Sequence, residues 1–228
     1  MRNRAPASTR TPPATNHVVL CLLALRDWTA YELAVQVRRS LRYCWPRTDR
    51  LIYVVPKRLV AHGLATVRRE PSPNGGRARR VYAITEAGRQ ALRAWRDTEP
   101  TEPELQSEAL VRLTFADQGT KTQALAAIDS IAGHAEERYR DGLEQLRGYL
   151  ADGGPFPERL HIIALTATFY ADHLRVLLDW AARARAQVEA WPDTAGQGMT
   201  TEARRMIEAT LQRGERDLSR AGSQATRP

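Results

Sequence analysis

Residues 45–88 read WPRTDRLIYVVPKRLVAHGLATVRREPSPNGGRARRVYAITEAG, and this stretch decides the fold. It opens with a helix-like run that ends at Gly63. Two alternating segments follow on either side of a basic, Gly-rich turn, and a second helix-like run comes after them. This order is typical of a winged helix-turn-helix, in which one helix enters a DNA groove and the hairpin contacts the backbone beside it. From Arg47 to Arg80 there are nine Lys or Arg and two acidic residues, which predicts DNA binding.

Charge is unevenly distributed along the 228 residues, whose formal net charge is +8. Residues 1–97 carry 19 Lys or Arg and 6 Asp or Glu, whereas residues 98–228 carry 15 and 20. A basic half joined to a mildly acidic half indicates one module that binds a polyanion and another that mediates assembly.

The residues carry no signature of an enzyme or a metal protein. Cys21 and Cys44 form neither a metal spacing nor a disulfide framework, and the five histidines show no metal spacing. There is no phosphate loop, nucleotide fingerprint or nucleophile elbow. We therefore expect no catalytic residue, no metal and no cofactor. Cys21 should be a buried small residue, and Cys44 either a packed bystander or a thiol sensor.

No apolar run is long enough to span a membrane, and no secretion signal is visible at the N-terminus. We expect a cytoplasmic protein associated with the nucleoid.

Residues 1–14 are rich in Pro, Ser and Arg, which predicts a disordered basic arm, either a solvated tail or a segment that seeks DNA. Residues 15–97 should form the DNA-binding domain. Its first helix is expected from Asn16 to Leu25, followed by a turn at residues 26–28. Thr29 and Glu32 have the spacing of a capping box that opens the second helix.

The third helix should begin with Thr48 as its N-cap. Ile52, Leu59 and Val60 would pack inward, and Pro56 would kink the helix because it lies well inside the helical run. Strands are predicted at residues 64–70 and 80–85, and Thr85 should cap a helix from residue 86 to about residue 96. We expect the third helix and the hairpin to supply the DNA contacts, through Arg47, Thr48, Arg50, Tyr53, Lys57, Arg58, Arg77, Arg79 and Arg80.

Residues 98–103 are expected to form a linker, and residues 98–191 as a whole a helical dimerisation domain. Apolar residues recur every three or four positions in residues 125–149 and again in residues 160–184, which predicts two long antiparallel helices. The second helix has a further apolar face that should pack against another subunit or, alternatively, against the DNA-binding half; it comprises Ile162, Phe169, Val176 and Trp180.

Residues 192–228 are expected to be a polar tail with a marginal helix over residues 201–218. Several aromatic residues could line a pocket for a small-molecule effector, although aromatic residues at helical spacing also occur in plain cores. These candidate ligand-binding residues are Trp95, Phe169, Tyr170 and Trp180.

Five stretches of the chain resemble the PadR-type transcriptional regulators. They read VVLCLLAL-x3-TAYEL, SLRYCWP, IY…KRL…GL, GGRARRVYAITEAGR and ALVRLTFAD, and they span residues 18–117. The helices that follow are similar to those of the longer, Vir-like members, whose C-terminal domain dimerises. The resemblance implies a homodimer on an inverted-repeat operator, with the third helix in successive major grooves.

The chain departs from the family pattern at two positions. Members commonly have Ser/Thr-x-x-Gln at the start of the recognition helix, whereas this chain has Thr48 followed by Leu51. Members also usually carry an apolar helix former at the position of Pro56.

Together the residues predict a mainly α protein with a small β wing, made of an N-terminal winged helix-turn-helix and a C-terminal long-helix dimerisation domain. The expected function is that of a sequence-specific, ligand-responsive repressor that acts on double-stranded DNA as a homodimer. The alternative is an architectural protein that coats nucleic acid non-specifically and senses no effector.

Overall fold

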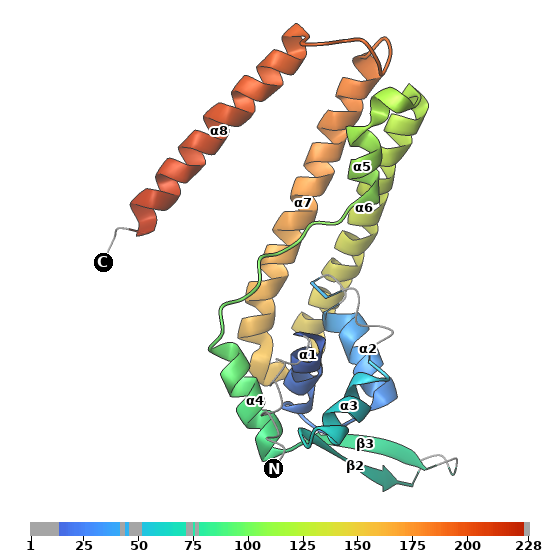
Figure 1. Cartoon of the computed structure of the whole chain (residues 1–228), viewed down its shortest axis with the longest axis vertical. Coiled ribbons are helices and arrows are strands. Elements are labelled where there is room, and N and C mark those ends of the chain that lie inside the picture. Colours follow the sequence, from blue (N-terminus) through green and yellow to red (C-terminus); the bar gives the residue numbers. More distant parts are fainter. Residues whose placement is uncertain (1–13, 42–43, 46–51, 72–74, 76–77, 226–228) are drawn as a thin grey trace, which may run out of the picture. The chain divides into compact units, whose positions relative to one another are not determined.

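The computed structural model describes residues 14–41, 44–45, 52–71, 75 and 78–225. The chain divides into two compact units, Met1–Pro103 and Glu104–Pro228. Both are mainly helical, and the N-terminal unit also contains a small sheet (Figure 1). The predicted fold class is confirmed.

In its described residues, the N-terminal unit combines four helices with a three-stranded antiparallel sheet whose strand order is β1-β3-β2. Its elements are α1 (Ala14–Leu23), β1 (Trp28–Thr29), α2 (Ala30–Ser40), α3 (Val55–Ala61), β2 (Ala65–Glu70), β3 (Arg79–Ile84) and α4 (Glu86–Arg96). The helix predicted from Asn16 to Leu25 is confirmed, with bounds two residues earlier. Strand β1 corrects the prediction of a plain turn at residues 26–28, because Trp28 pairs with Tyr82 of β3.

Side-chain caps fix the starts of α2 and α4. The Thr29 hydroxyl accepts from the backbone N–H of Glu32 at 3.2 Å, and the Glu32 carboxylate accepts from the N–H of Thr29 at 2.7 Å. This reciprocal pair confirms the predicted capping box. The Thr85 hydroxyl accepts from the N–H of Gly88 at 3.0 Å and donates to the carbonyl of Gly63 at 2.7 Å. Thr85 therefore joins the end of the hairpin to the loop after α3.

The core of this unit is formed by apolar side chains of the helices together with side chains of the sheet. Trp28 lies in this core, with its indole N–H donating to the carbonyl of Leu22 at 2.7 Å. The Arg26 guanidinium lies 3.8 Å from the centroid of the Trp28 ring and covers its outer side. The other buried apolar residues are Val19, Leu20, Leu22, Leu23, Leu33, Ala34, Val37, Ile52, Val55, Leu59, Ala65, Val81, Tyr82 and Leu92.

The C-terminal unit is built on two long helices. Its elements are α5 (Glu108–Thr114), the 3-10 turn η2 (Ala116–Gln118), α6 (Lys121–Asp152), the 3-10 turn η3 (Pro157–Arg159), α7 (Leu160–Ala190) and α8 (Thr201–Ala225). Gly153, with φ 74°, ends α6 in the left-handed conformation that glycine adopts at little cost.

Helices α6 and α7 pack side by side, as predicted (Figure 1). Every position of the predicted inner stripe is buried or half-buried: Leu125, Ile128, Ala132, Ala135, Tyr139, Gly142, Leu146, Tyr149, Leu160, Ile163, Ala167, Tyr170, Leu174, Leu177, Ala181 and Ala184.

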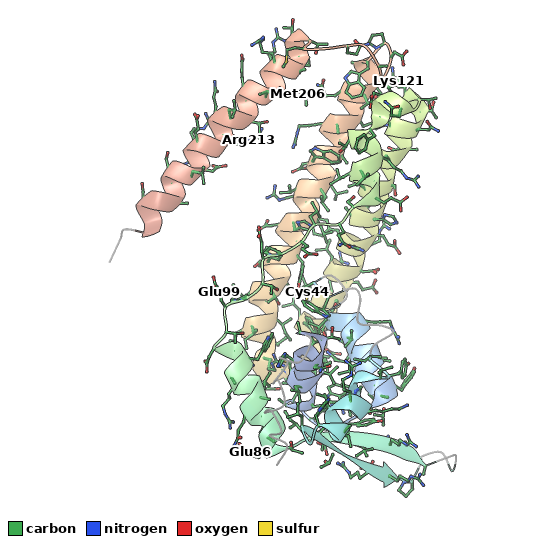
Figure 2. All side chains as sticks on the ribbon, viewed as in Figure 1. Cys44, Glu86, Glu99, Lys121, Met206 and Arg213 are labelled. Atoms are coloured by element: carbon green, nitrogen blue, oxygen red, sulfur yellow. The ribbon has the colours of Figure 1, made fainter. Side chains whose placement is uncertain are left out.

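The start of α6 lies beside the end of α7, which makes the pair antiparallel. The Lys121 ammonium donates to the carbonyls of Glu189 at 2.6 Å and Trp191 at 2.8 Å (Figure 2). A cation at the last carbonyls of a helix is favourable because those groups have no partner within the helix. The Thr194 hydroxyl donates to the carbonyl of Gly119 at 3.0 Å, so the chain stays close to the start of α6 until this point.

Helix α8 is longer than the marginal helix expected over residues 201–218, and its described side chains are exposed apart from the half-exposed Ala203. None of the described helices is both long and apolar enough to cross a membrane.

Candidate nucleic-acid interface

Helix α3 starts later than its sequence suggested. Residues 52–54 form turns, and the α-helix begins at Val55. Pro56 therefore lies in the first helical turn, where its missing N–H has no intrahelical partner to lose. The kink predicted at Pro56 is wrong for this reason. The expected N-cap Thr48 lies outside the described residues.

The two sides of α3 differ in polarity. Val55, Pro56 and Leu59 are buried against the rest of the unit. Lys57 and Arg58 are exposed on the opposite side. Tyr53, in the turn before the helix, keeps 47% of its surface exposed. Among the expected DNA-contacting residues, Arg47, Thr48, Arg50 and Arg77 lie outside the described residues.

The hairpin of β2 and β3, the wing, has a defined register. Glu70 lies opposite Arg79, and Arg69 lies opposite Arg80. Gly75, in the segment that connects the two strands, has φ 69°, a left-handed conformation that glycine adopts at little cost. Because side chains alternate along a strand, these two pairs project from opposite faces of the wing.

One face of the wing carries a network of ion pairs. The Arg68 guanidinium pairs with Asp27 and lies 2.9 Å from the Glu70 carboxylate. Arg79 pairs with the other oxygen of Glu70 at 3.1 Å. The hydrogen bonds from Arg68 to Asp27 and Glu70 raise the pKa of Arg68 above its ordinary value. The positive charges of Arg68 and Arg79 are therefore matched by the negative charges of Asp27 and Glu70.

The other face of the wing carries uncompensated positive charge. Arg69 and Arg80 are both exposed, and neither has an acidic partner within the described part of the chain. Like charges directly opposite each other in a ladder are unfavourable by about 0.2–1 kcal/mol. Such a pair can bind a phosphate backbone, which removes the repulsion. Arg69 was not among the residues expected to contact DNA. Pairing the two strands symmetrically about the turn at Gly75 would have placed Arg69 opposite Arg80.

The four aromatic residues expected to line an effector pocket have different environments. Trp95 belongs to the N-terminal unit and stacks on His17, with ring centroids 5.0 Å apart and 4° between the planes. Trp180 packs against the core cluster of Ile128, Ala181 and Val188, so its own chain partly covers this member of the further apolar face expected on the helix. Phe169 is 68% exposed and meets Tyr170 edge-on at 5.6 Å.

Two adjacent polar side chains of α1 are buried. The Oδ1 atom of Asn16 and the Nδ1 atom of His17 have no hydrogen-bond partner among the residues that the structure describes. Burial lowers the pKa of His17, so its neutral form is favoured beside the Trp95 ring.

Neither cysteine is fully buried. Cys21 is half-buried rather than buried as predicted, and Cys44 is exposed rather than packed. The Cys44 thiol donates to the carbonyl of Leu41 at 3.6 Å.

Residues 19–94 match the model of the transcriptional regulator PadR-like family. The N-terminal unit carries a PadR-like domain. The match extends from α1 almost to the end of α4, so it includes α3 and both strands of the wing. A search of the curated proteins gave no match.

Solved structures share the fold of the PadR-like domain and the long helices after it. PadR of Bacillus subtilis in complex with operator DNA is 17% identical, with a TM-score of 0.64 over 77% of this chain and 99% of that one. The same protein in complex with p-coumaric acid is 16% identical, with a TM-score of 0.58 over 78% and 99%. The virulence activator AphA of Vibrio cholerae is 22% identical, with a TM-score of 0.61 over 77% and 98%.

Proposed function

We propose that this PadR-like protein binds double-stranded DNA sequence-specifically and regulates transcription as a repressor. The observation that carries the proposal is the Arg69–Arg80 pair on the wing, where two like charges face each other and no described acidic side chain pairs with either. A polyanion explains why a hairpin would retain such a pair. The exposed side of α3, with Lys57, Arg58 and Tyr53, supplies groups suited to a DNA groove. A regulator of this kind would act in the cytoplasm, on the nucleoid.

The PadR complex with operator DNA supports DNA as the polyanion. Sequence specificity is tested by footprinting the protein on the DNA upstream of its own gene. Binding to the protected sequence and to a scrambled version is then compared as salt is raised. We expect the protected sequence to hold the protein at salt concentrations that release scrambled DNA. Loss of both at the same salt concentration would instead identify a non-specific architectural protein.

We further propose that the protein acts as a homodimer through its C-terminal helices, on an inverted-repeat operator. The outer face of α7, defined by Ile162, Leu165, Phe169 and Val176, is exposed in a single chain. A continuous apolar face of this size is typical of an interface, and a second copy of the chain is its simplest partner. Sedimentation equilibrium of the full chain tests this directly, with Phe169→Asp expected to weaken association.

An effector is the remaining part of the proposal. Phe169 and Tyr170 on α7 present aromatic surface on which a planar ligand could stack, and PadR has been solved with p-coumaric acid. A ligand changes DNA affinity only through different affinities for two states of the protein. The proposal fails if compounds that bind the full chain leave its operator affinity unchanged.

A further inference from the structure

Lysine is rare in this chain. Of its 34 basic residues, 32 are arginines, and Lys57 and Lys121 are the two lysines. The two residue types differ in reactivity, because a guanidinium keeps its proton in proteins whereas a lysine amine can lose one and act as a nucleophile. A reagent that acylates amines therefore meets two side-chain targets, one in each compact unit.

Lys121 is engaged in contacts of the C-terminal unit. It is half-buried, and its ammonium donates to the carbonyls of Glu189 at 2.6 Å and Trp191 at 2.8 Å (Figure 2). An acylated nitrogen keeps one N–H, so acylation of Lys121 would leave one of these carbonyls without its donor. The contact between the start of α6 and the end of α7 therefore opposes this reaction.

Lys57 has the opposite environment. Its side chain is exposed, and it has neither a hydrogen-bond nor an ion-pair partner among the described residues. Acylation of Lys57 would thus break no contact in the described part of the protein. Lys57 lies on the side of α3 away from the buried Val55 and Leu59, and this is the side that we assign to DNA. An acyl group converts the ammonium into a neutral amide and removes one positive charge from that side.

The charge of each unit adds to this difference. The acyl donors of metabolism, acyl phosphates and acyl thioesters of coenzyme A, are anions. Residues 1–97, which include Lys57, carry 19 basic and 6 acidic residues, whereas residues 98–228, which include Lys121, carry 15 and 20. A positive potential raises the local concentration of an anionic reactant, and a negative potential lowers it. Both kinds of donor should therefore collect near Lys57 rather than near Lys121.

We propose that Lys57 is an acylation site through which an anionic acyl donor releases the protein from DNA; this inference rests on the proposed DNA-binding function. The deprotonated Lys57 amine attacks the acyl carbonyl carbon and forms an amide C–N bond. The bond from that carbon to the phosphate oxygen or the thioester sulfur breaks, and the leaving group takes the electron pair. One of the three ammonium protons stays on the amide nitrogen, and two pass to solvent or to the leaving group.

Acylation and DNA binding should oppose each other in both directions. The acylated side chain has lost the charge that attracts a phosphate, so DNA binds less tightly. By linkage, bound DNA must also disfavour the acylated form. DNA that covers this side of α3 also keeps the donor away from the amine, so it should slow the reaction.

The rate of acylation at each lysine tests the site in the full chain. Acetyl phosphate and acetyl coenzyme A are used in separate reactions, and peptide masses follow both lysines over time. We expect Lys57 to react at least about tenfold faster than Lys121. In denaturing urea, where the contacts of Lys121 are lost, the two rates should become similar. Equal rates in the folded chain, or no reaction of Lys57 with either donor, overturn the proposal. Reaction with one donor alone identifies the source of the acyl group.

The affinity for DNA upstream of the protein's own gene tests the consequence. Acetylation should weaken binding about fivefold and reduce the slope of log K against log salt by about 1, because one cationic contact is lost. The same treatment should leave the affinity of Lys57→Arg at its value before treatment, because arginine is not acylated. The matched control is Lys121→Arg, which should lose affinity on treatment as the natural protein does. Equal losses in both variants would assign the effect to another group.

Protection by DNA separates this inference from the proposed function. Bound DNA should slow acetylation of Lys57 and leave that of Lys121 unchanged. If the untreated protein binds DNA but acetylation changes neither affinity nor protection, the inference is wrong and the proposed function stands. If the untreated protein binds no DNA, the proposed function is wrong and release from DNA falls with it. The masses then still decide whether Lys57 is the preferred acylation site.

Discussion

Arg69 and Arg80 lie directly opposite each other in the ladder of β2 and β3, and no acidic side chain in the described part of the chain compensates them. One step along the same ladder, Arg79 is paired with Glu70. The wing therefore has one face whose charges are paired and one face that is cationic. Arg79 and Arg80 are neighbours in the sequence, but only Arg80 lies on the cationic face.

The first prediction concerns the cationic face. Arg69→Ala or Arg80→Ala should weaken DNA binding similarly on all sequences and reduce the slope of log K against log salt by about 1, because one phosphate contact is lost. Fluorescence anisotropy across a salt series measures the slope. Arg79→Ala is the matched control and should reduce the slope less, since this arginine is paired with Glu70. Equal effects of all three variants would rule out a preferred face.

The second prediction concerns the turn before α3. Tyr53→Ala should change which sequence is preferred, because an exposed phenol near the start of this helix can contact base edges. Selection of bound sequences from a random pool compares the variant with the natural protein. Lys57→Ala serves as the control, with a uniform loss of affinity expected. A uniform loss from Tyr53→Ala would exclude base contact by Tyr53.

The third prediction concerns Gly88 in α4. A Cβ built at this residue would lie 2.1 Å from the carbonyl oxygen of Leu64, and a backbone atom cannot move aside as a side-chain tip can. Gly88→Ala should lower the free energy of unfolding by about 1–3 kcal/mol. Gly133→Ala in α6, where a Cβ meets no atom within 4 Å, should raise it by about 0.5–1 kcal/mol. Urea denaturation of both variants measures the contrast, and equal stabilities would refute it.

The fourth prediction concerns pH. Burial lowers the pKa of His17 in the folded chain, whereas the unfolded chain keeps a value near 6.5. Below that pH the unfolded state binds the proton more readily, so stability is complete above about pH 6.5 and declines as pH falls, by at most about 1.4 kcal/mol per pH unit. Denaturation at several pH values, with His17→Phe as a non-titrating variant that keeps an aromatic ring beside Trp95, measures this contribution. Identical pH profiles for the two proteins would show that His17 contributes nothing.

Local chemistry explains why much of the fold could be predicted. The capping box of Thr29 and Glu32 depends on residues three positions apart, and the hairpin pairs two strands that follow each other in the sequence. The apolar residues between α6 and α7 recur over several helical turns, which is enough to identify the side of each helix that faces the other. Each of these signals is contained within one element or within two neighbouring elements.

The features that escaped prediction depend on distant parts of the chain. Strand β1 has two residues and exists because Trp28 and Thr29 pair with β3, more than fifty residues away. Pro56 suggested a kink because the helix was expected to start earlier, whereas the helical turn begins one residue before it. The difference in charge between the two faces of the wing depends in part on Asp27, which precedes β1 and pairs with Arg68. The sequence alone does not show that these two residues meet.

The ion pairs of Asp27, Arg68, Glu70 and Arg79 are exposed, and salt screens exposed pairs as it screens contacts with phosphate. Raising the ionic strength therefore acts on this protein twice: it competes at the DNA and it loosens the attachment of β2 to the loop before β1. The slope of a salt titration then contains a contribution from the protein itself. If the slope is converted into a number of neutralised phosphates, that number will be larger than the number of phosphates that the protein contacts. The excess should disappear when Asp27 and Arg68 are replaced together by an uncharged pair.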